Sequence, residues 1–273
     1  MNLSLSRNSR RIDPRTQHRP SAWASGDYAV VGNALQIVSE ELCESVNLCD
    51  GQRVLDVAAG NYHASMAAAR RWCDVTATEV PSDLTRRSRP CVEAESVGVR
   101  FIDADAEALP FADQSFDAVL SSFGAMFALD QERAASEMVR VCRRGRPVGL
   151  ANWTPRGFVG QLYRTLAAFM PGGQAQSSCD WGTSERLQEL FGVYGEVDCA
   201  AKHVAFRART PMDWVDKLRA SHAPVVRAFS IQDAAGRKSL RGALLELVTR
   251  FNRAKDGTML VNAEYLEVVV RRR

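Results

Sequence analysis

The segment that decides the fold reads Val54-Leu55-Asp56-Val57-Ala58-Ala59-Gly60-Asn61-Tyr62-His63-Ala64. Its apolar start is typical of a strand buried inside a parallel sheet, and the strand ends in an acidic turn that contains a glycine. The residues after the turn predict a helix whose first N–H groups face the carboxyl edge of the sheet. This combination of strand, turn and helix is typical of a site for a nucleotide cofactor.

Strand and helix patterns alternate on both sides of this segment. The sequence predicts strands over 52–57, 75–80, 99–103, 116–122 and 147–153, and helices over 63–72, 82–97 and 131–142. Such alternation with short connections predicts an α/β protein with a Rossmann-like, doubly wound and mostly parallel sheet. Two later β-like runs, 197–207 and 265–270, bring the expected sheet to seven strands with helices on both faces.

The rest of the chain predicts helical additions to this sheet. A helix over 25–48 precedes the first strand, and further helices are expected over 158–169, 183–191, 211–220 and 233–252. We therefore expect one domain. Its parts are a basic tail (1–20), an N-terminal helical cover (21–50), a cofactor-binding core (51–153), a helical substrate cap with a late strand (154–262) and a final strand (263–273).

Composition limits the class of protein. The chain has 273 residues, of which 46% are hydrophobic, without an apolar run long enough for a membrane helix or an apolar signal-peptide core near its start. This pattern predicts a soluble cytoplasmic protein. Seven cysteines show neither a Cys-x-x-Cys pair nor a zinc-like spacing with histidine, so we expect no metal site.

The net charge of +3 is unevenly distributed along the chain. Residues 1–20 carry +4 and Arg271–Arg273 carry +3, which leaves −4 for the body of the chain. A mildly acidic body argues against a nucleic-acid-binding surface. The basic start is best read as a solvated tail, with an organelle presequence or an RNA-contacting arm as the alternatives. We expect a small-molecule partner and leave the oligomeric state open, with a homodimer among the options.

One acidic residue follows the second predicted strand. Glu79 ends that strand about twenty residues after the first turn. A carboxylate there can accept hydrogen bonds from both ribose hydroxyls of a cofactor. The alternative is a surface glutamate that merely ends a strand.

Several ordered motifs resemble the class I S-adenosylmethionine (SAM)-dependent methyltransferases, in particular the small-molecule branch similar to the ubiquinone/menaquinone-biosynthesis enzymes. Asp56, Ala58 and Gly60 match the family's Asp-x-(Gly/Ala)-x-Gly-x-Gly turn, and Asp103–Phe111 is similar to its Gly-Asp-Ala-Glu-x-Leu-Pro-Phe signature. The resemblance spans about residues 20–271 and includes the motif Trp23–Tyr28.

The resemblance implies SAM as the cofactor, with S-adenosylhomocysteine as the product. It assigns contacts with adenine to Asp105 and Ala106, and places Ser121 and Phe123 beside the methionine half. Glu107, Met126 and Phe127 are equally well explained as turn or packing residues. His222 lies in a region where family members line the substrate cavity, so it is the candidate general base, although a lone histidine is more often structural.

The implied activity is methyl transfer to an O, N or C atom of a small organic substrate, such as a secondary metabolite. The single glycine of the turn disfavours a nicotinamide dehydrogenase, and Ser121-Ser122-Phe123-Gly124 lacks the Asn/Asp-Pro-Pro-Tyr/Phe motif of enzymes that methylate nucleic-acid bases. Aromatic residues after the fifth strand suggest an apolar or aromatic substrate, with two or three of them reaching it. They are Trp153, Phe158, Tyr163, Phe169, Trp181 and Trp214.

The chain departs from the family at Tyr62, where the last glycine is expected, at His63, and at Pro90. If the Tyr62 ring enters the site it occupies space for the methionine moiety, and if it turns away the site is intact; the surrounding matches favour the second outcome. The departure keeps one alternative open, a protein of this fold that does not transfer methyl. Such a protein would be a SAM-assisted cyclase or decarboxylase, or a binding protein.

Overall fold

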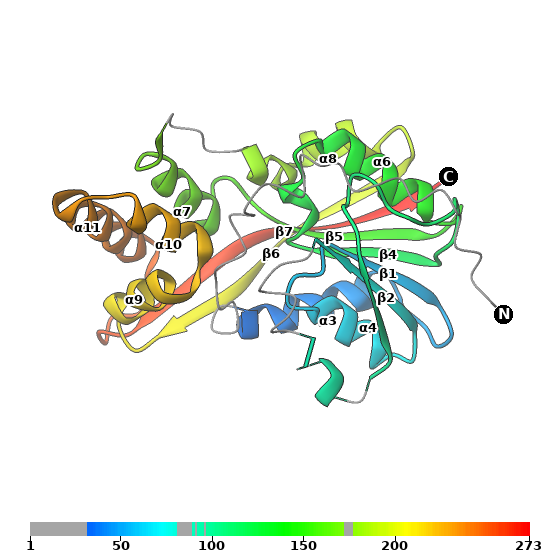
Figure 1. Ribbon diagram of the computed structural model, residues 1–273, viewed down its shortest axis with the longest axis horizontal. Coiled ribbons are helices and arrows are strands. Elements are labelled where there is room, and N and C mark those ends of the chain that lie inside the picture. The colour runs from blue at the N-terminus through cyan, green and yellow to red at the C-terminus, as the bar shows by residue number, and fades with distance from the viewer. Residues whose placement is uncertain (1–31, 81–88, 91, 96, 172–176) are drawn as a thin grey trace.

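A computed structural model describes residues 32–80, 89–90, 92–95, 97–171 and 177–273. They form a seven-stranded sheet with the strand order β3-β2-β1-β4-β5-β7-β6 (Figure 1). Strands β1 to β5 are parallel, β7 is antiparallel to β5, and β6 is antiparallel to β7. The strands are β1 Arg53–Val57, β2 Asp74–Glu79, β3 Val99–Asp103, β4 Ala118–Ser122, β5 Pro147–Trp153, β6 Gly195–Ala208 and β7 Met259–Arg272. The Rossmann-like fold class expected from the sequence is confirmed.

Helices cover both faces of the sheet, as Figure 1 shows. One face is covered by α3 (Gln36–Ser45) and α4 (His63–Ala69), and the other by α6 (Gln131–Val141) and α8 (Ser184–Phe191). Short 3-10 helices occur at η1 (Asn33–Leu35), η2 (Ala125–Phe127) and η4 (Ser177–Gly182). Asp130 and Thr183 start α6 and α8, because each side chain accepts a hydrogen bond from a backbone N–H of the first turn.

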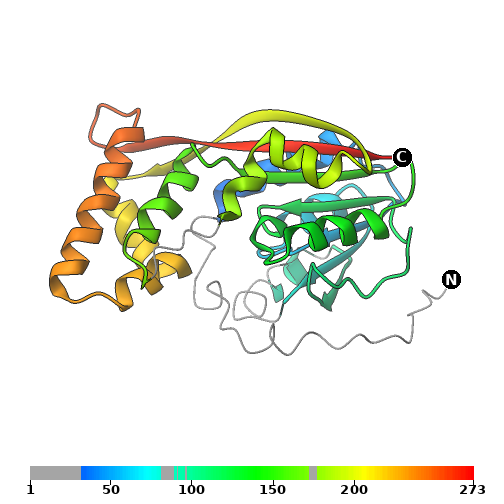
Figure 2. The ribbon, with the colours of Figure 1, turned by 90° about the horizontal axis from the view of Figure 1, so that it is seen from above.

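Four further helices form a lobe beside the sheet, which we call the helical lobe. It contains α7 (Phe158–Ala167), α9 (Pro211–Ser221), α10 (Ala223–Ser230) and α11 (Ala234–Phe251). The 14-residue strands β6 and β7 extend from the sheet into this lobe as a two-stranded ribbon (Figure 2). The chain leaves β6 at Ala208 and returns opposite it at Met259, so α9 to α11 form one insertion between two paired strands.

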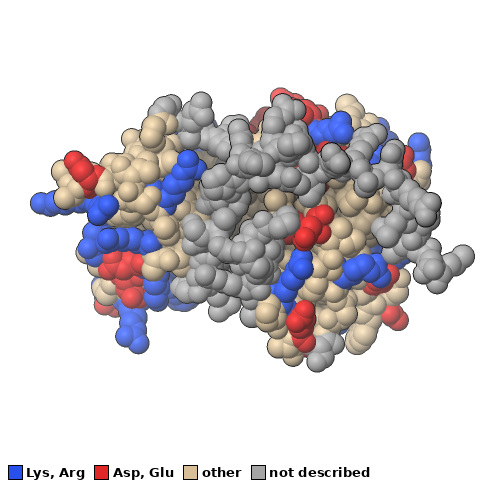
Figure 3. All heavy atoms as spheres, in the orientation of Figure 1, with Lys and Arg blue, Asp and Glu red and all other residues tan. Residues whose placement is uncertain are grey.

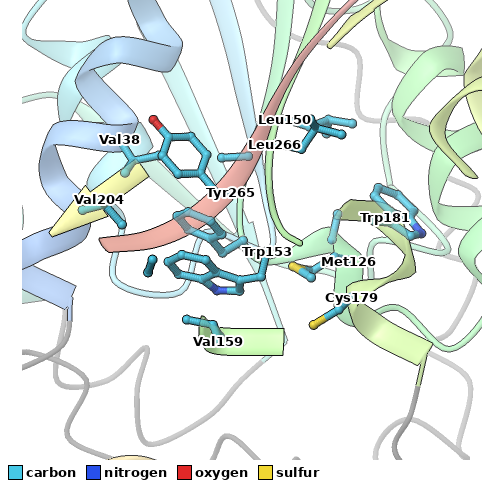
Figure 4. Packing of buried hydrophobic residues seen from close by; sticks show 14 of the residues in the cluster. Val38, Met126, Leu150, Trp153, Val159, Cys179, Trp181, Val204, Tyr265 and Leu266 are labelled. Carbon is cyan, nitrogen blue, oxygen red and sulfur yellow. The ribbon is translucent and has the colours of Figure 1, made fainter. Parts of the chain in front are cut away.

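A continuous hydrophobic core joins the sheet to the lobe. Trp153, Phe158, Trp181 and Trp214 are all buried in it, whereas Tyr163 and Phe169 are partly buried. Figure 4 shows Trp153 between Tyr265 and Val204 from the two long strands and Met126 and Trp181 from the segments on its other side. Most of the aromatic residues considered for substrate contact are therefore core residues.

Several element boundaries differ from those expected. Helix α10 lies between the expected helices 211–220 and 233–252, and Pro224 is in its first turn, where the missing N–H of proline costs nothing. Strand β7 begins at Met259, before the expected 263–273 segment, since its first half alternates buried and partly exposed residues against β6. The tail 1–20, the motif Trp23–Tyr28, the first part of the 25–48 helix and most of the 82–97 helix lie outside the described residues.

Candidate functional site

The carboxyl ends of β1 and β2 meet at Glu79. Its two carboxylate oxygens accept hydrogen bonds from the backbone N–H groups of Gly60 and Val80, each at 2.9 Å. Burial raises the pKa of Glu79, while the two N–H donors act in the opposite direction. The structure thus brings two of the expected residues, Gly60 and Glu79, into direct contact.

The turns after β1 and β4 contain an unusual concentration of left-handed backbone. Ala58 has φ 54°, Gly60 54°, Tyr62 62° and Phe123 62°. Three of these residues carry a Cβ, and such a conformation costs an L-residue about 1–2 kcal/mol. The two turns also touch, because a Cβ on Gly124 would lie 2.0 Å from the Ala58 carbonyl oxygen. Strained backbone of this kind gathers at ligand sites, where the surrounding structure holds it in place.

Asp56 lies beneath these turns, only 1% exposed. Its Oδ2 accepts a hydrogen bond from Ser65 Oγ of α4 at 2.6 Å, and within the described chain its Oδ1 has no hydrogen-bond partner. Burial raises the pKa of Asp56 to about 7. Ser65 was missed in the sequence, since a serine nine residues after an aspartate carries no recognisable motif.

The segment after β3 lies next to this pair of turns. The Ala104 N–H donates to the Glu79 carbonyl oxygen at 3.1 Å, and Asp105 is close enough to Glu79 to contribute to the rise in its pKa. Asp105 Oδ1 accepts a hydrogen bond from the Glu107 N–H at 2.9 Å, which fixes the direction of the carboxylate. Ala106 packs against the edge of the hydrophobic core.

Ser121 and Phe123 occupy the end of β4. Ser121 Oγ donates to the Val57 carbonyl oxygen at 2.8 Å and accepts from the Ala125 N–H at 2.9 Å, so this side chain links β1 to η2. The Phe123 ring stacks on Trp153 with a centroid distance of 3.9 Å, and Tyr265 meets it edge-on at 5.8 Å. These contacts hold the left-handed backbone of Phe123.

The Tyr62 ring lies in a small buried cluster between α4 and the strands β2 and β3. It is 1% exposed, packs with Met66, Ala77 and Val92, and meets the Phe101 ring of β3 at 4.9 Å in a T-shaped arrangement. Tyr62 is the N-terminal cap of α4 rather than a residue inside the helix. A glycine is favoured at this position for its freedom at positive φ, in addition to the closer approach that it allows a ligand.

His222 connects to the sheet edge through two aromatic rings. Phe127 of η2 meets Tyr163 of α7 at 5.7 Å, and the Tyr163 ring lies 6.1 Å from the His222 imidazole. His222 joins α9 to α10, is 6% exposed, and has its pKa lowered to about 4 by burial. Its imidazole is therefore neutral near pH 7.

Comparisons with known proteins identify the family. A family model described as a methyltransferase domain matches residues 55–146. A demethylmenaquinone methyltransferase of Renibacterium salmoninarum is 39% identical over 170 residues, which are 59% of this chain and 68% of that protein. The uncharacterized protein Rv1405c of Mycobacterium tuberculosis is 32% identical over 263 residues, 94% of each chain.

The chain belongs to the class I SAM-dependent methyltransferases. The fold of this methyltransferase is also that of the YcgJ protein from Bacillus subtilis, with a TM-score of 0.59 at 16% identity over 89% of this chain and 99% of the other. The resemblance stated from the sequence is confirmed at the level of the family.

SAM is the cofactor of the family, and the residues at this edge fit it. Asp56 Oδ1 is a buried acceptor with no partner among the described residues, and a Cβ added to Gly60 would have no heavy atom of the described chain within 4 Å. The Glu79 oxygens each retain a lone pair after accepting one N–H. Three carboxylates at this edge also suit a ligand that carries a sulfonium and an ammonium group.

Membrane-spanning helices and metal-binding clusters were looked for in the described parts of the chain alone. Within them, no helix is long and apolar enough to cross a membrane. The same residues contain no group of three or more His, Cys, Asp or Glu side chains arranged to hold a metal ion.

Proposed function

We propose that this methyltransferase transfers the methyl group of SAM to an O, N or C atom of a small organic molecule. The observation that carries the proposal is the Glu79 carboxylate, which is held between the Gly60 and Val80 N–H groups at the end of β2. A carboxylate fixed in this way can accept hydrogen bonds from two vicinal hydroxyls without having to reorient.

In this proposal the other residues at the carboxyl edge of the sheet each contact a different part of SAM. Asp105 accepts a hydrogen bond from the exocyclic amine of adenine, and the Ala106 N–H serves the neighbouring ring nitrogen. Ser121 and Phe123 border the methionine half, and Asp56 stabilises its ammonium group. Ala58 and Gly60 shape the turn so that its backbone can lie close to the ligand.

The acceptor molecule is proposed to bind between η2 and the helical lobe. Phe127 and Tyr163 are only partly buried there, in contrast to the fully packed tryptophans of the core. An apolar or aromatic ring would pack against these two side chains. The name of the Renibacterium relative, a demethylmenaquinone methyltransferase, supports an aromatic acceptor of the quinone type.

Methyl transfer requires little acid–base catalysis by the protein. The cofactor supplies a methyl group on a positively charged sulfur, which is already activated toward in-line attack. The chain's residues align the two reactants and exclude water, and positioning of this kind contributes several kcal/mol. His222, neutral near pH 7, is the proposed proton acceptor if the attacking atom must lose a proton.

A protein of this fold that does not transfer methyl is disfavoured. The alternative rested on Tyr62 as an obstacle in the site, and the ring instead packs against Phe101. Together with membership of the family, this supports the transfer reaction.

The proposal is tested by calorimetric titration of the purified protein with SAM and S-adenosylhomocysteine, followed by incubation with SAM and small aromatic acceptors. We expect binding of both ligands and a product heavier than its acceptor by one methylene. Failure to bind either ligand at millimolar concentration would overturn the cofactor assignment. Binding without any methylated product from hydroxylated, aminated or quinol-type aromatic acceptors would overturn the proposed substrate class.

A further inference from the structure

The helical lobe differs in charge from the rest of the molecule. The segment 209–258, which forms α9 to α11, contains ten Lys and Arg against five Asp and Glu, a net charge of +5. Since the whole chain carries +3, the remainder carries −2. On the face of the molecule drawn in Figure 3, Lys and Arg side chains gather over this lobe.

Four of these ten basic residues lie where α9, α10 and α11 meet. The Arg219 guanidinium lies over the Phe229 ring at 5.1 Å, and Arg237 Nε donates a hydrogen bond to the Phe229 carbonyl oxygen at 3.1 Å. Two arginines are thereby held around the end of α10. Arg227 and Lys238 are exposed on the adjoining turns of α10 and α11. We call these four residues the cationic tip.

Little negative charge offsets the cationic tip locally. In the stretch 227–238 the acidic residue is Asp233, and its Oδ1 accepts a hydrogen bond from the Gly236 N–H at the start of α11. Of the neighbouring acidic residues on α9, Asp216 pairs with Arg241 at 2.9 Å and Asp213 pairs with Lys217 at 3.1 Å. The charges of the tip are therefore available to an external anion.

An aliphatic side chain is exposed at the same place. Ile231, directly after α10, is 46% exposed. The junction of α10 and α11 lies at the end of the lobe away from the β6–β7 ribbon, so the tip projects from the molecule (Figure 2). Basic side chains around an exposed aliphatic residue suit a surface that offers both negative charge and hydrocarbon.

We propose that the cationic tip docks on the surface of an anionic lipid bilayer. Each Lys or Arg close to such a surface adds attraction, and an aliphatic side chain can enter the boundary between headgroups and acyl chains. A nucleic acid offers phosphate without that hydrocarbon boundary, so the exposed Ile231 favours the bilayer. The inference rests on the lobe alone and does not depend on the proposed methyl transfer.

The test uses the full chain and two kinds of vesicle, one of phosphatidylcholine alone and one that also contains phosphatidylglycerol. Cosedimentation should show binding to the anionic vesicles that weakens steeply with added salt, with little binding to the neutral ones. The double variant Arg227→Glu/Lys238→Glu should lower the partition coefficient at least about tenfold. Ile231→Ser should lower it by a smaller factor that added salt does not change.

A matched control removes the same charge far from the tip. Arg144→Glu/Arg146→Glu changes two exposed arginines in the turn between α6 and β5, which lies at the other end of the sheet from the lobe. It should bind anionic vesicles nearly as well as the unmodified chain. The proposal is overturned by absence of vesicle binding, by equal binding to neutral vesicles, by equal loss in both double variants, or by tighter binding to homopolymeric RNA at the same salt concentration.

Discussion

The Gly60 backbone N–H donates a hydrogen bond to Glu79 Oε2 across 2.9 Å, and this bond joins the turn after β1 to the end of β2. It makes Glu79 part of the turn's own structure as well as a candidate ligand group. Loss of the carboxylate removes this bond to Gly60 and, in the proposed function, is expected to weaken binding of the cofactor as well.

Glu79→Ala is expected to weaken SAM binding tenfold or more, because hydrogen bonds to a charged group contribute about 1.5–3 kcal/mol each. Calorimetry measures the change. Asp103→Ala is the matched control, since Asp103 is the register partner of Glu79 on β3 but forms its ion pair with Arg89 at 2.8 Å. Equal losses in the two variants would remove Glu79 from the proposed site.

Asp105 should determine which base the site accepts. Its carboxylate can accept a hydrogen bond from an amine but not from a carbonyl oxygen, so the wild type should bind S-adenosylhomocysteine much more tightly than its inosine analogue. Asp105→Ala should lose most of that preference. If the unmodified protein binds the two compounds equally, Asp105 does not contact the base.

Tyr62→Gly should affect stability much more than cofactor binding. Loss of a buried ring lowers the free energy of unfolding by about 3–5 kcal/mol. A glycine is not strained at φ 62°, which raises the free energy of unfolding by about 1–2 kcal/mol. The expected decrease in the free energy of unfolding is therefore roughly 2 kcal/mol, measured by denaturant titration. Tyr62→Phe, which keeps the ring, is the control. A marked tightening of SAM binding in the glycine variant would show that the ring restricts the site after all.

Asp56→Asn should stabilise the ligand-free protein at about pH 8 and weaken its binding of SAM. Because burial raises the pKa of Asp56 to about 7, the folded protein binds this proton more tightly than the unfolded chain does. The contribution of Asp56 to stability is thus favourable at low pH and is lost as the pH rises through 7. Asp117→Asn should have the opposite effect at pH 8, since the hydrogen bond from the Arg53 N–H and the ion pair with Arg143 lower the pKa of Asp117. A destabilised Asp56→Asn protein at pH 8 would contradict this account.

His222 should act on stability in the other direction. Its pKa is about 4 in the folded protein, against about 6.5 in an unfolded chain. As the pH falls below 6.5 the unfolded chain takes up the proton first, so stability is lost toward pH 4. Compared with wild type, His222→Gln should retain roughly 2 kcal/mol more of its free energy of unfolding between about pH 8 and pH 5. The control variant is His203→Gln, at a half-exposed histidine on β6. Equal pH dependence in His222→Gln and wild type would show that His222 does not carry this effect.

The sheet could be predicted from the sequence because its signals are local. Apolar runs such as Val54–Val57 and Val75–Ala77 form buried strands wherever they occur in an alternating pattern, and turns with Gly60 or Glu79 follow them. The helical cover on both faces could be predicted from the alternation of strands and helices, whereas the order of the strands could not.

Other features depended on contacts between distant residues. The direction of the Tyr62 ring depends on Phe101 of β3, thirty-nine positions later, and no local pattern encodes that pair. The bond from Ser65 to Asp56 likewise appears only when α4 packs on β1. Helix α10 was not predicted either, because it is stabilised by the burial of Val225, Ala228 and Phe229 in the lobe; Pro224 is tolerated in its first turn.

The two ends of the inserted lobe are paired with each other, which bears on how the lobe can vary among related chains. Ala208 and Met259 are direct neighbours across the β6–β7 ladder, so the fifty residues between them begin and end at the same point in space. Changes of length within α9 to α11 therefore need not alter the register of β1 to β5, provided that the side chains packed on Phe158, such as Trp214, are kept. If the acceptor binds beside the helical lobe as proposed, changes in α9 to α11 would alter the choice of acceptor without altering the strands that hold the cofactor.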